Sequence, residues 1–232
     1  MNELVTCRNL TKRYGSKFAL NNVSLSIESG KIVGLLGPNG SGKTTLIKIL
    51  NQLITPTSGE VLIGGSPLTV ETKAKISYLP DRMCLGNWMH VADAINFFAD
   101  FYTDFDRSRA QDMLDKLHIR PSDTIRAMSK GTKEKLQLIL VMSRRAALYC
   151  LDEPIAGVDP AARDYILSTI LNNYDPDATI LISTHLISDV ENILDEVIFI
   201  REGSILLQSS VDDLRIQNGK SVDHVFREVF KC

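Results

Sequence analysis

The stretch Gly37-Pro-Asn-Gly-Ser-Gly-Lys-Thr44 matches the phosphate-loop pattern G-x-x-x-x-G-K-[ST] at every defined position. The glycines Gly37, Gly40 and Gly42 let the backbone wrap tightly, so that several N–H groups can point at one anion. Lys43 adds a cation for the β- and γ-phosphates of a nucleotide, and Thr44 offers a hydroxyl to Mg²⁺. The stretch therefore predicts a site for nucleotide phosphates.

The sequence on either side favours the same interpretation. An apolar run at residues 31–36 precedes the loop, as a buried strand would. Residues 45–50 can form a helix whose N-terminus faces the phosphates. A strand, a glycine-rich loop and a helix in this order are the context that a phosphate loop requires.

The rest of the chain predicts a mixed architecture. The first 80 residues are rich in strand signals, whereas residues 91–118 have apolar residues at helical spacing. Short apolar strands at 147–151 and 179–183 then alternate with helices, which is typical of a parallel sheet. We therefore expect an α/β fold, with a phosphate-loop NTPase core, an N-terminal antiparallel β subdomain and a helical subdomain at about residues 86–144.

Composition restricts the class of protein. The chain has 232 residues with 26 Lys plus Arg and 28 Asp plus Glu, so that its net charge of −2 gives no reason to expect a nucleic acid partner. No apolar run approaches the roughly 18–20 residues that span a bilayer, and the N-terminus has no apolar signal core. We expect a cytoplasmic protein whose four widely spaced cysteines are free thiols, with Cys150 in the core.

Five aromatic side chains recur along the helical stretch, and they allow two interpretations. They could belong to the core or to a docking surface, and core packing is favoured because aromatic helix faces usually pack inward. The five residues are Phe97, Phe98, Phe101, Tyr102 and Phe105.

A second chemical signal is the apolar strand that ends in Asp152 and Glu153. Beside a phosphate loop, Asp152 is placed to hold Mg²⁺ directly or through water. Glu153 can polarise an attacking water molecule.

With these motifs in this order, the chain resembles the nucleotide-binding subunit of ATP-binding cassette (ABC) transporters over about residues 3–210. Ser129-Lys-Gly-Thr132 looks like the family signature, normally written L-S-G-G-Q. Ala156-Gly-Val-Asp159 looks like the family's D-loop, and Ser183-Thr-His185 ends the strand where the family carries its switch histidine. Tyr14 is at the position where an aromatic ring stacks on adenine.

The resemblance implies one ABC ATPase domain over residues 1–232, with ATP and Mg²⁺ as cofactors. Glu153 and His185 would be the catalytic residues, and Thr44, Asp81 and Asp152 would hold the metal. In the family, the signature contacts a γ-phosphate held by the opposite subunit, so that a head-to-tail dimer encloses two nucleotides. The implied nucleotide-binding residues are Tyr14, Gly37, Pro38, Asn39, Gly40, Ser41, Gly42, Lys43, Thr44, Thr45, Ser129, Gly131 and Asp159.

Three positions depart from the family pattern. Asp81 replaces a Gln that contacts Mg²⁺ and senses the membrane partner in the family. A carboxylate can still bind Mg²⁺, but it cannot donate a hydrogen bond as an amide does. Lys130 and Thr132 replace a Gly and a Gln of the signature, and these changes concern coupling more than ATP binding.

The function expected from the resemblance is ATP hydrolysis that drives export through a separate transmembrane permease subunit. The subunit would lie on the inner face of the cell membrane as a homodimer or a paralogous heterodimer. A groove beside the helical region would receive a helix of the permease, with Trp88 and Phe105 as candidate contacts. Core packing is an equal alternative for both residues. The alternative is a soluble assembly ATPase of ABC type without a transmembrane partner.

Overall fold

The computed structural model describes residues 3–230, and the side chains of all of these except residues 161 and 162. Its N-terminal part is an antiparallel sheet in the order β2-β1-β4-β5. The strands are β1 (Glu3–Tyr14), β2 (Lys17–Glu28), β4 (Ser58–Ile63) and β5 (Ser66–Pro67). The predicted antiparallel β subdomain is therefore confirmed.

A second sheet forms the centre of the molecule, in the order β10-β9-β3-β8-β7-β6. Neighbouring strands from β9 to β6 run parallel, and β10 pairs antiparallel with β9. Every residue of β3, β7 and β8 is buried, which explains why these strands are mainly apolar and carry their polar residues at the ends. The strands are β3 (Ile32–Leu36), β6 (Ile76–Leu79), β7 (Leu148–Asp152), β8 (Thr179–Thr184), β9 (Glu196–Arg201) and β10 (Ser204–Ser210).

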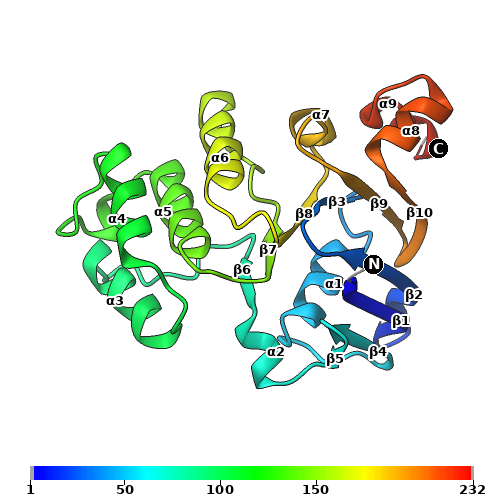
Figure 1. The fold of residues 1–232 in the computed structure, drawn as a ribbon, viewed down its shortest axis with the longest axis horizontal. Coiled ribbons are helices and arrows are strands. Elements are labelled where there is room, and N and C mark those ends of the chain that lie inside the picture. The colour runs from blue at the N-terminus through cyan, green and yellow to red at the C-terminus, as the bar shows by residue number, and fades with distance from the viewer. Residues whose placement is uncertain (1–2, 231–232) are drawn as a thin grey trace.

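The helices fall into three groups along the chain (Figure 1). The helices α1 (Lys43–Leu50) and α2 (Val70–Ala74) lie near the two sheets. A separate helical region, at the left of Figure 1, contains α3 (Val91–Phe101), α4 (Arg107–Lys116), the 3₁₀ turn η1 (Ile125–Ala127) and α5 (Lys130–Met142). The remaining helices are α6 (Pro160–Asn172), α7 (Ile187–Val190), α8 (Val211–Asn218) and α9 (Val222–Val229). These observations confirm the predicted fold class.

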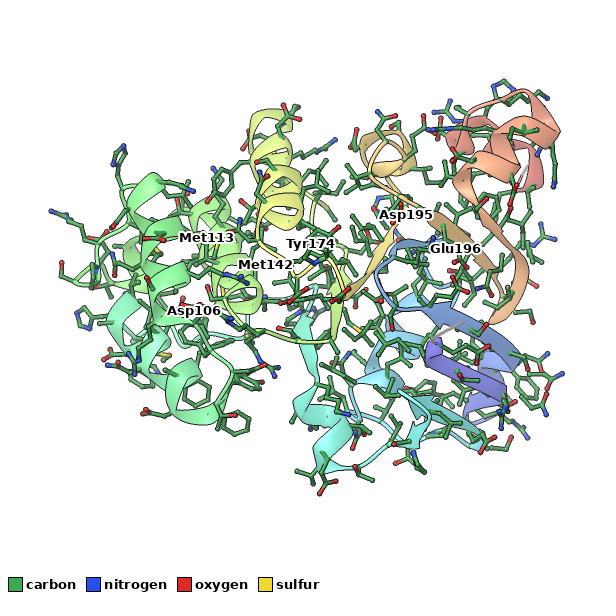
Figure 2. All side chains as sticks on the ribbon, viewed as in Figure 1. Asp106, Met113, Met142, Tyr174, Asp195 and Glu196 are labelled. Carbon is green, nitrogen blue, oxygen red and sulfur yellow. The ribbon has the colours of Figure 1, made fainter. Side chains whose placement is uncertain are left out.

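The helical region has its own apolar interior, which joins the core around the central sheet. Met113 of α4 and Met142 of α5 both belong to this core (Figure 2), and both are almost fully buried. The interpretation of the aromatic stripe as core is wrong for Phe97 and Phe101, which are 56% and 70% exposed. Phe97 and Phe101 are one helical turn apart on the outer side of α3, where their rings stack. Phe98 is buried in the core instead.

A buried arginine joins the helical region to the central sheet. Arg144 follows α5 and forms a bidentate ion pair with Asp104, with both N–O distances 3.0 Å. Its guanidinium also donates to the backbone carbonyls of Ala74 and Ile76, where β6 begins, and it stacks on the ring of Tyr102 at 3.9 Å. One side chain thus contacts both parts of the molecule.

The cysteines behave as expected within the described residues. Cys7, Cys84 and Cys150 are free thiols, and the predicted burial of Cys150 is confirmed. Burial raises the pKa of the Cys150 thiol to about 12, so that it stays protonated and unreactive. Cys232 lies outside the described residues.

None of the helices between residues 3 and 230 combines the length and the apolar character that a bilayer crossing requires.

Candidate functional site

The sequence motifs meet at one edge of the central sheet. The neighbouring strands β3, β8, β7 and β6 are parallel, so that their carboxyl ends lie side by side. The phosphate loop follows β3, His185 follows β8, and Asp152 and Glu153 stand at the end of β7. Asp81 comes two residues after β6. In open α/β sheets this edge is where ligands bind.

The phosphate loop is packed so closely that two of its glycines are required. A Cβ on Gly37 would lie 2.3 Å from the carbonyl oxygen of Ile200. Gly42 has a φ of +114°, and a Cβ there would lie 2.6 Å from the carbonyl oxygen of Ala19. Gly42 is also the N-cap of α1, where no side chain of the described residues occupies the free N–H groups. These N–H groups and the helix dipole are therefore available to an anion.

Lys43 is held inside the site rather than extended into solvent. Its Nζ donates to the carbonyl oxygen of Gly37 at 2.7 Å and to that of Pro38 at 3.3 Å. It also lies 3.3 Å from Oε1 of Glu153, and both of these side chains are nearly buried. A phosphate group entering the loop would therefore meet a cation that is already in position.

Asp152 has the surroundings expected of a metal ligand. Its Oδ1 accepts hydrogen bonds from the hydroxyls of Thr44, at 3.1 Å, and Ser183, at 2.5 Å. Burial raises the pKa of its carboxyl group, while these hydrogen bonds lower it and the nearby Asp81 and Glu153 raise it further. Its buried Oδ2 has no hydrogen-bond partner among the described residues.

The donor set therefore fits Mg²⁺, which takes oxygen ligands and keeps part of its coordination for phosphate and water. Asp152 would supply a carboxylate, Thr44 a hydroxyl and Asp81 a second carboxylate. The described residues contain no cluster of three or more His, Cys, Asp or Glu side chains that would bind a metal alone.

Glu153 is held in an unusual backbone conformation, with a φ of +51°. Its N–H donates to the carbonyl oxygen of Ser183 at 3.0 Å and to the hydroxyl of the same residue at 3.2 Å. Its Oε2 lies 3.0 Å from Nδ1 of His185. Backbone strain of this kind is concentrated at functional sites, and here it directs a carboxylate between Lys43 and His185.

A cavity of about 580 Å³ opens over the phosphate loop. Tyr14 stands at one side of it with 54% of its surface exposed, and Nζ of Lys12 lies 5.1 Å from the centre of its ring. An exposed aromatic ring at the rim is suited to stacking on a flat base. The described residues around this cavity are Tyr14, Lys17, Phe18, Ala19, Asn39, Gly40, Ser41, Gly42, Lys43, Thr44, Thr45, Asp81, Glu153, Ala156 and His185.

Five of the implied nucleotide-binding residues are not among those that line this cavity: Gly37, Pro38, Ser129, Gly131 and Asp159. Gly37 and Pro38 begin the phosphate loop itself, whereas the other three lie elsewhere in the chain. Ser129 is the N-cap of α5, where its hydroxyl accepts a hydrogen bond from the N–H of Thr132 at 3.2 Å. Ser129 and Asp159 are exposed, and Gly131 is half-buried in the first turn of α5. Within one chain, the signature therefore stands apart from the phosphate loop (Figure 1).

Sequence reasoning missed two contributors to the site. Ser183 holds both Asp152 and the backbone of Glu153, and its position two residues before His185 was the available signal. Phe18 lines the cavity near Tyr14 because β1 and β2 form a hairpin at this point. The position of Phe18 at this cavity follows only from the pairing of the two strands.

Comparison with known proteins gives the family. A family model described as "ABC transporter" matches residues 20–156. The SkfA peptide export ATP-binding protein SkfE of Bacillus subtilis (strain 168) is 32% identical over 210 residues, covering 88% of this chain and 88% of that protein. The lantibiotic transport ATP-binding protein SrtF of Streptococcus pyogenes is 31% identical over 211 residues, covering 90% and 92% of the two chains.

Solved structures agree with this result. A structure described as the ATP binding subunit of an ABC transporter superposes with a TM-score of 0.86 at 27% identity, covering 98% of this chain and 100% of that chain. A bacterial ABC transporter cassette, solved as a dimer, has the same fold, with a TM-score of 0.78 at 22% identity over 89% of this chain and 98% of that one. Both the family match and the geometry of the phosphate site lead to one conclusion: this chain belongs to the ABC transporter family, as an ATP-binding subunit of the ABC ATPase type.

Proposed function

We propose that this subunit binds ATP with Mg²⁺, forms a head-to-tail dimer around two nucleotides, and hydrolyses them to drive export through a separate membrane subunit. The observation that carries the proposal is the cavity at the sheet edge, which brings Lys43, Asp81, Glu153 and His185 together above the phosphate loop. The other elements of the proposal follow from the geometry around this cavity.

The chemical step proposed is attack of water on the γ-phosphorus, with ADP as the leaving group. Glu153 would accept a proton from that water, because its carboxylate is held at a fixed position by Lys43 and His185. The loop N–H groups and Lys43 would stabilise the charge on the phosphate oxygens. Mg²⁺, when bound, neutralises charge on the same oxygens. Asp152 and Thr44 would hold it.

The dimer is proposed because the signature of one chain lies outside the cavity over its own phosphate loop. Ser129 and Gly131 lie at the N-terminus of α5, which favours an anion, yet neither lines the cavity of their own chain. A second subunit, arranged head to tail, would bring this N-terminus to the γ-phosphate of the first. That second subunit would be either another copy of this chain or a paralogue.

A surface for the membrane subunit is proposed between the helical region and the sheet. A groove of about 580 Å³ lies there, and its walls include Leu53, Val70 and Phe101, which are 50%, 80% and 70% exposed. Exposed apolar side chains gathered in a groove are typical of protein interfaces. The expected contacts Trp88 and Phe105 are not among its lining residues, so Phe101 and Tyr102 replace them as candidates.

The direction of transport and the location rest on the relatives. SkfE is named for peptide export and SrtF for lantibiotic transport. We extend these names to the present chain as a proposal, in which the subunit acts at the cytoplasmic face of a membrane and its cargo is a peptide or a similar toxic compound. Nucleic acid has no part in this proposal.

The dimer proposal is tested with Glu153→Gln, which should keep ATP bound. Light scattering during gel filtration is expected to show a monomer without nucleotide and a dimer with ATP and Mg²⁺. Adding Ser129→Ala should abolish this dimer. Ser210→Ala is the matched control, because Ser210 caps α8 in the same way, with a 3.0 Å bond to the N–H of Asp213.

Two results would count against the head-to-tail arrangement. One is equal loss of the dimer in the Ser129→Ala and Ser210→Ala variants, because capping alone would then explain the effect. The other is an intact dimer after Ser129→Ala. A chain that binds ATP but never forms a dimer by itself would indicate a paralogous partner instead.

A further inference from the structure

The loop that carries Asp81 is tied to α5 by one side chain. Gln137 of α5 is only 4% exposed, and its amide bridges the two ends of this loop. Its Nε2 donates to the carbonyl oxygen of Pro80 at 3.2 Å, and its Oε1 accepts the N–H of Cys84 at 3.0 Å. An amide is suited to this task because it has a donor and an acceptor and carries no charge.

The attachment continues along the chain towards α3. Nζ of Lys133 donates to Oδ1 of Asn87 at 3.3 Å, and the N–H of Arg126 donates to the carbonyl oxygen of Asn87 at 3.1 Å. The segment at residues 80–89 therefore runs along the segment at residues 125–137. The second of these segments contains the signature, so that the loop and the signature are parts of one connected unit.

Asp81 faces the metal side of the nucleotide site from this loop. It lines both the cavity over the phosphate loop and a second cavity of about 280 Å³ that Asp152 and Gln137 also line. Asp81 and Asp152 therefore border the same second cavity. The position of Asp81 thus depends on a loop whose ends are held by Gln137.

We propose that Gln137 is a positioning residue that holds Asp81 at the metal side of the nucleotide site. This inference rests on the proposed function, because it assumes that Mg²⁺ accompanies ATP. It assigns a role to a buried amide that neither the phosphate loop nor the signature includes. Asp81 has a carboxylate where the family has the amide of a Gln. In this chain the amide of Gln137 holds the loop that carries Asp81.

The test measures binding rather than turnover. Titration calorimetry measures the affinity for the slowly hydrolysed analogue AMP-PNP, once with Mg²⁺ and once with EDTA. The ratio of the first affinity to the second is the metal-dependent gain. Gln137→Met keeps the length and approximate volume of the side chain but removes its hydrogen bonds to Pro80 and Cys84. The variant is expected to lower the metal-dependent gain roughly tenfold, since each bond contributes modestly. Affinity in EDTA should remain unchanged.

Two further variants separate positioning from packing. Asp81→Ala, at an exposed position, should reduce the gain by a similar factor. In the Asp81→Ala background, Gln137→Met should have no additional effect, because a residue that acts through Asp81 cannot act without it. Gln111→Met is the control, because Gln111 lies on α4 and donates to Asp115 of the same helix at 2.7 Å.

The outcomes are distinguishable. A wild-type metal-dependent gain in Asp81→Ala overturns the inference even if Gln137→Met does not fold. Independent losses that add in the double variant, or an equal loss of affinity in EDTA, also overturn it, because Gln137 would then serve packing alone. If the wild-type chain does not bind AMP-PNP at all, the proposed function itself fails.

Discussion

Two adjacent arginines allow a direct test of what joins the helical region to the sheet. Arg144 is 2% exposed at its side chain and pairs with Asp104, whereas Arg145 is 71% exposed and pairs with Asp106 at 3.0 Å. The two substitutions, Arg144→Met and Arg145→Met, remove the same charge from neighbouring positions. Only the first removes a side chain that contacts both parts of the molecule.

The size of the effect follows from the contacts that are lost. Arg144→Met leaves Asp104 and two backbone carbonyls without their donor and removes the stacking on Tyr102. Breaking a buried ion pair costs about 3–5 kcal/mol, and the lower end applies because Asp104 is 26% exposed to water. Arg145→Met should cost about 0–1 kcal/mol, as is usual for exposed pairs.

Thermal unfolding followed by circular dichroism measures this difference. Since a chain of this size changes its melting temperature by roughly 2–4 °C per kcal/mol, Arg144→Met should melt at least ~6 °C lower than the wild type. The melting temperature of Arg144→Lys should lie between those of the wild type and Arg144→Met. Lysine keeps the charge, but its ammonium group cannot form the bidentate pair with Asp104. If Arg144→Met and Arg145→Met are destabilised to within about 1 kcal/mol of each other, burial of the pair does not decide the stability of this junction.

The remaining predictions concern the nucleotide and partner sites. Lys43→Ala should nearly abolish ATP binding and turnover, and wild-type values in calorimetry and phosphate release would refute the assigned role. Asp152→Asn should abolish the Mg²⁺-dependent gain in nucleotide affinity and yet raise the melting temperature of the nucleotide-free protein. The reason is that burial raises the pKa of Asp152, so that stability is present at low pH and is lost as pH rises through the folded-state pKa. The wild-type melting temperature should therefore fall with rising pH relative to that of Asp152→Asn, and parallel profiles would contradict this. Phe101→Ser should reduce co-purification with the membrane subunit, whereas Ile216→Ser, at an equally exposed position on α8, should not; equal recovery in both variants would place the docking surface elsewhere.

Local sequence determined the elements that carry the chemistry. The glycine spacing from Gly37 to Gly42, the apolar run before it and the two acids at the end of β7 each have a mechanical reason that does not depend on distant residues. Their order along the chain was sufficient for the family and for the fold class. The terminal helices α8 and α9 were not predicted, because they lie beyond the segment that resembles the family.

The tertiary structure decided what depends on contacts between distant segments. Phe98 and Phe101 follow the same helical pattern, yet one is buried and the other exposed, since only packing against α4 and α5 decides which side of α3 faces inward. Ser183 meets Asp152, and Gln137 meets Pro80, across separations of 31 and 57 residues. A sequence pattern records which groups can form hydrogen bonds, whereas the pairing of strands and the packing of helices decide which of those groups come within reach of each other.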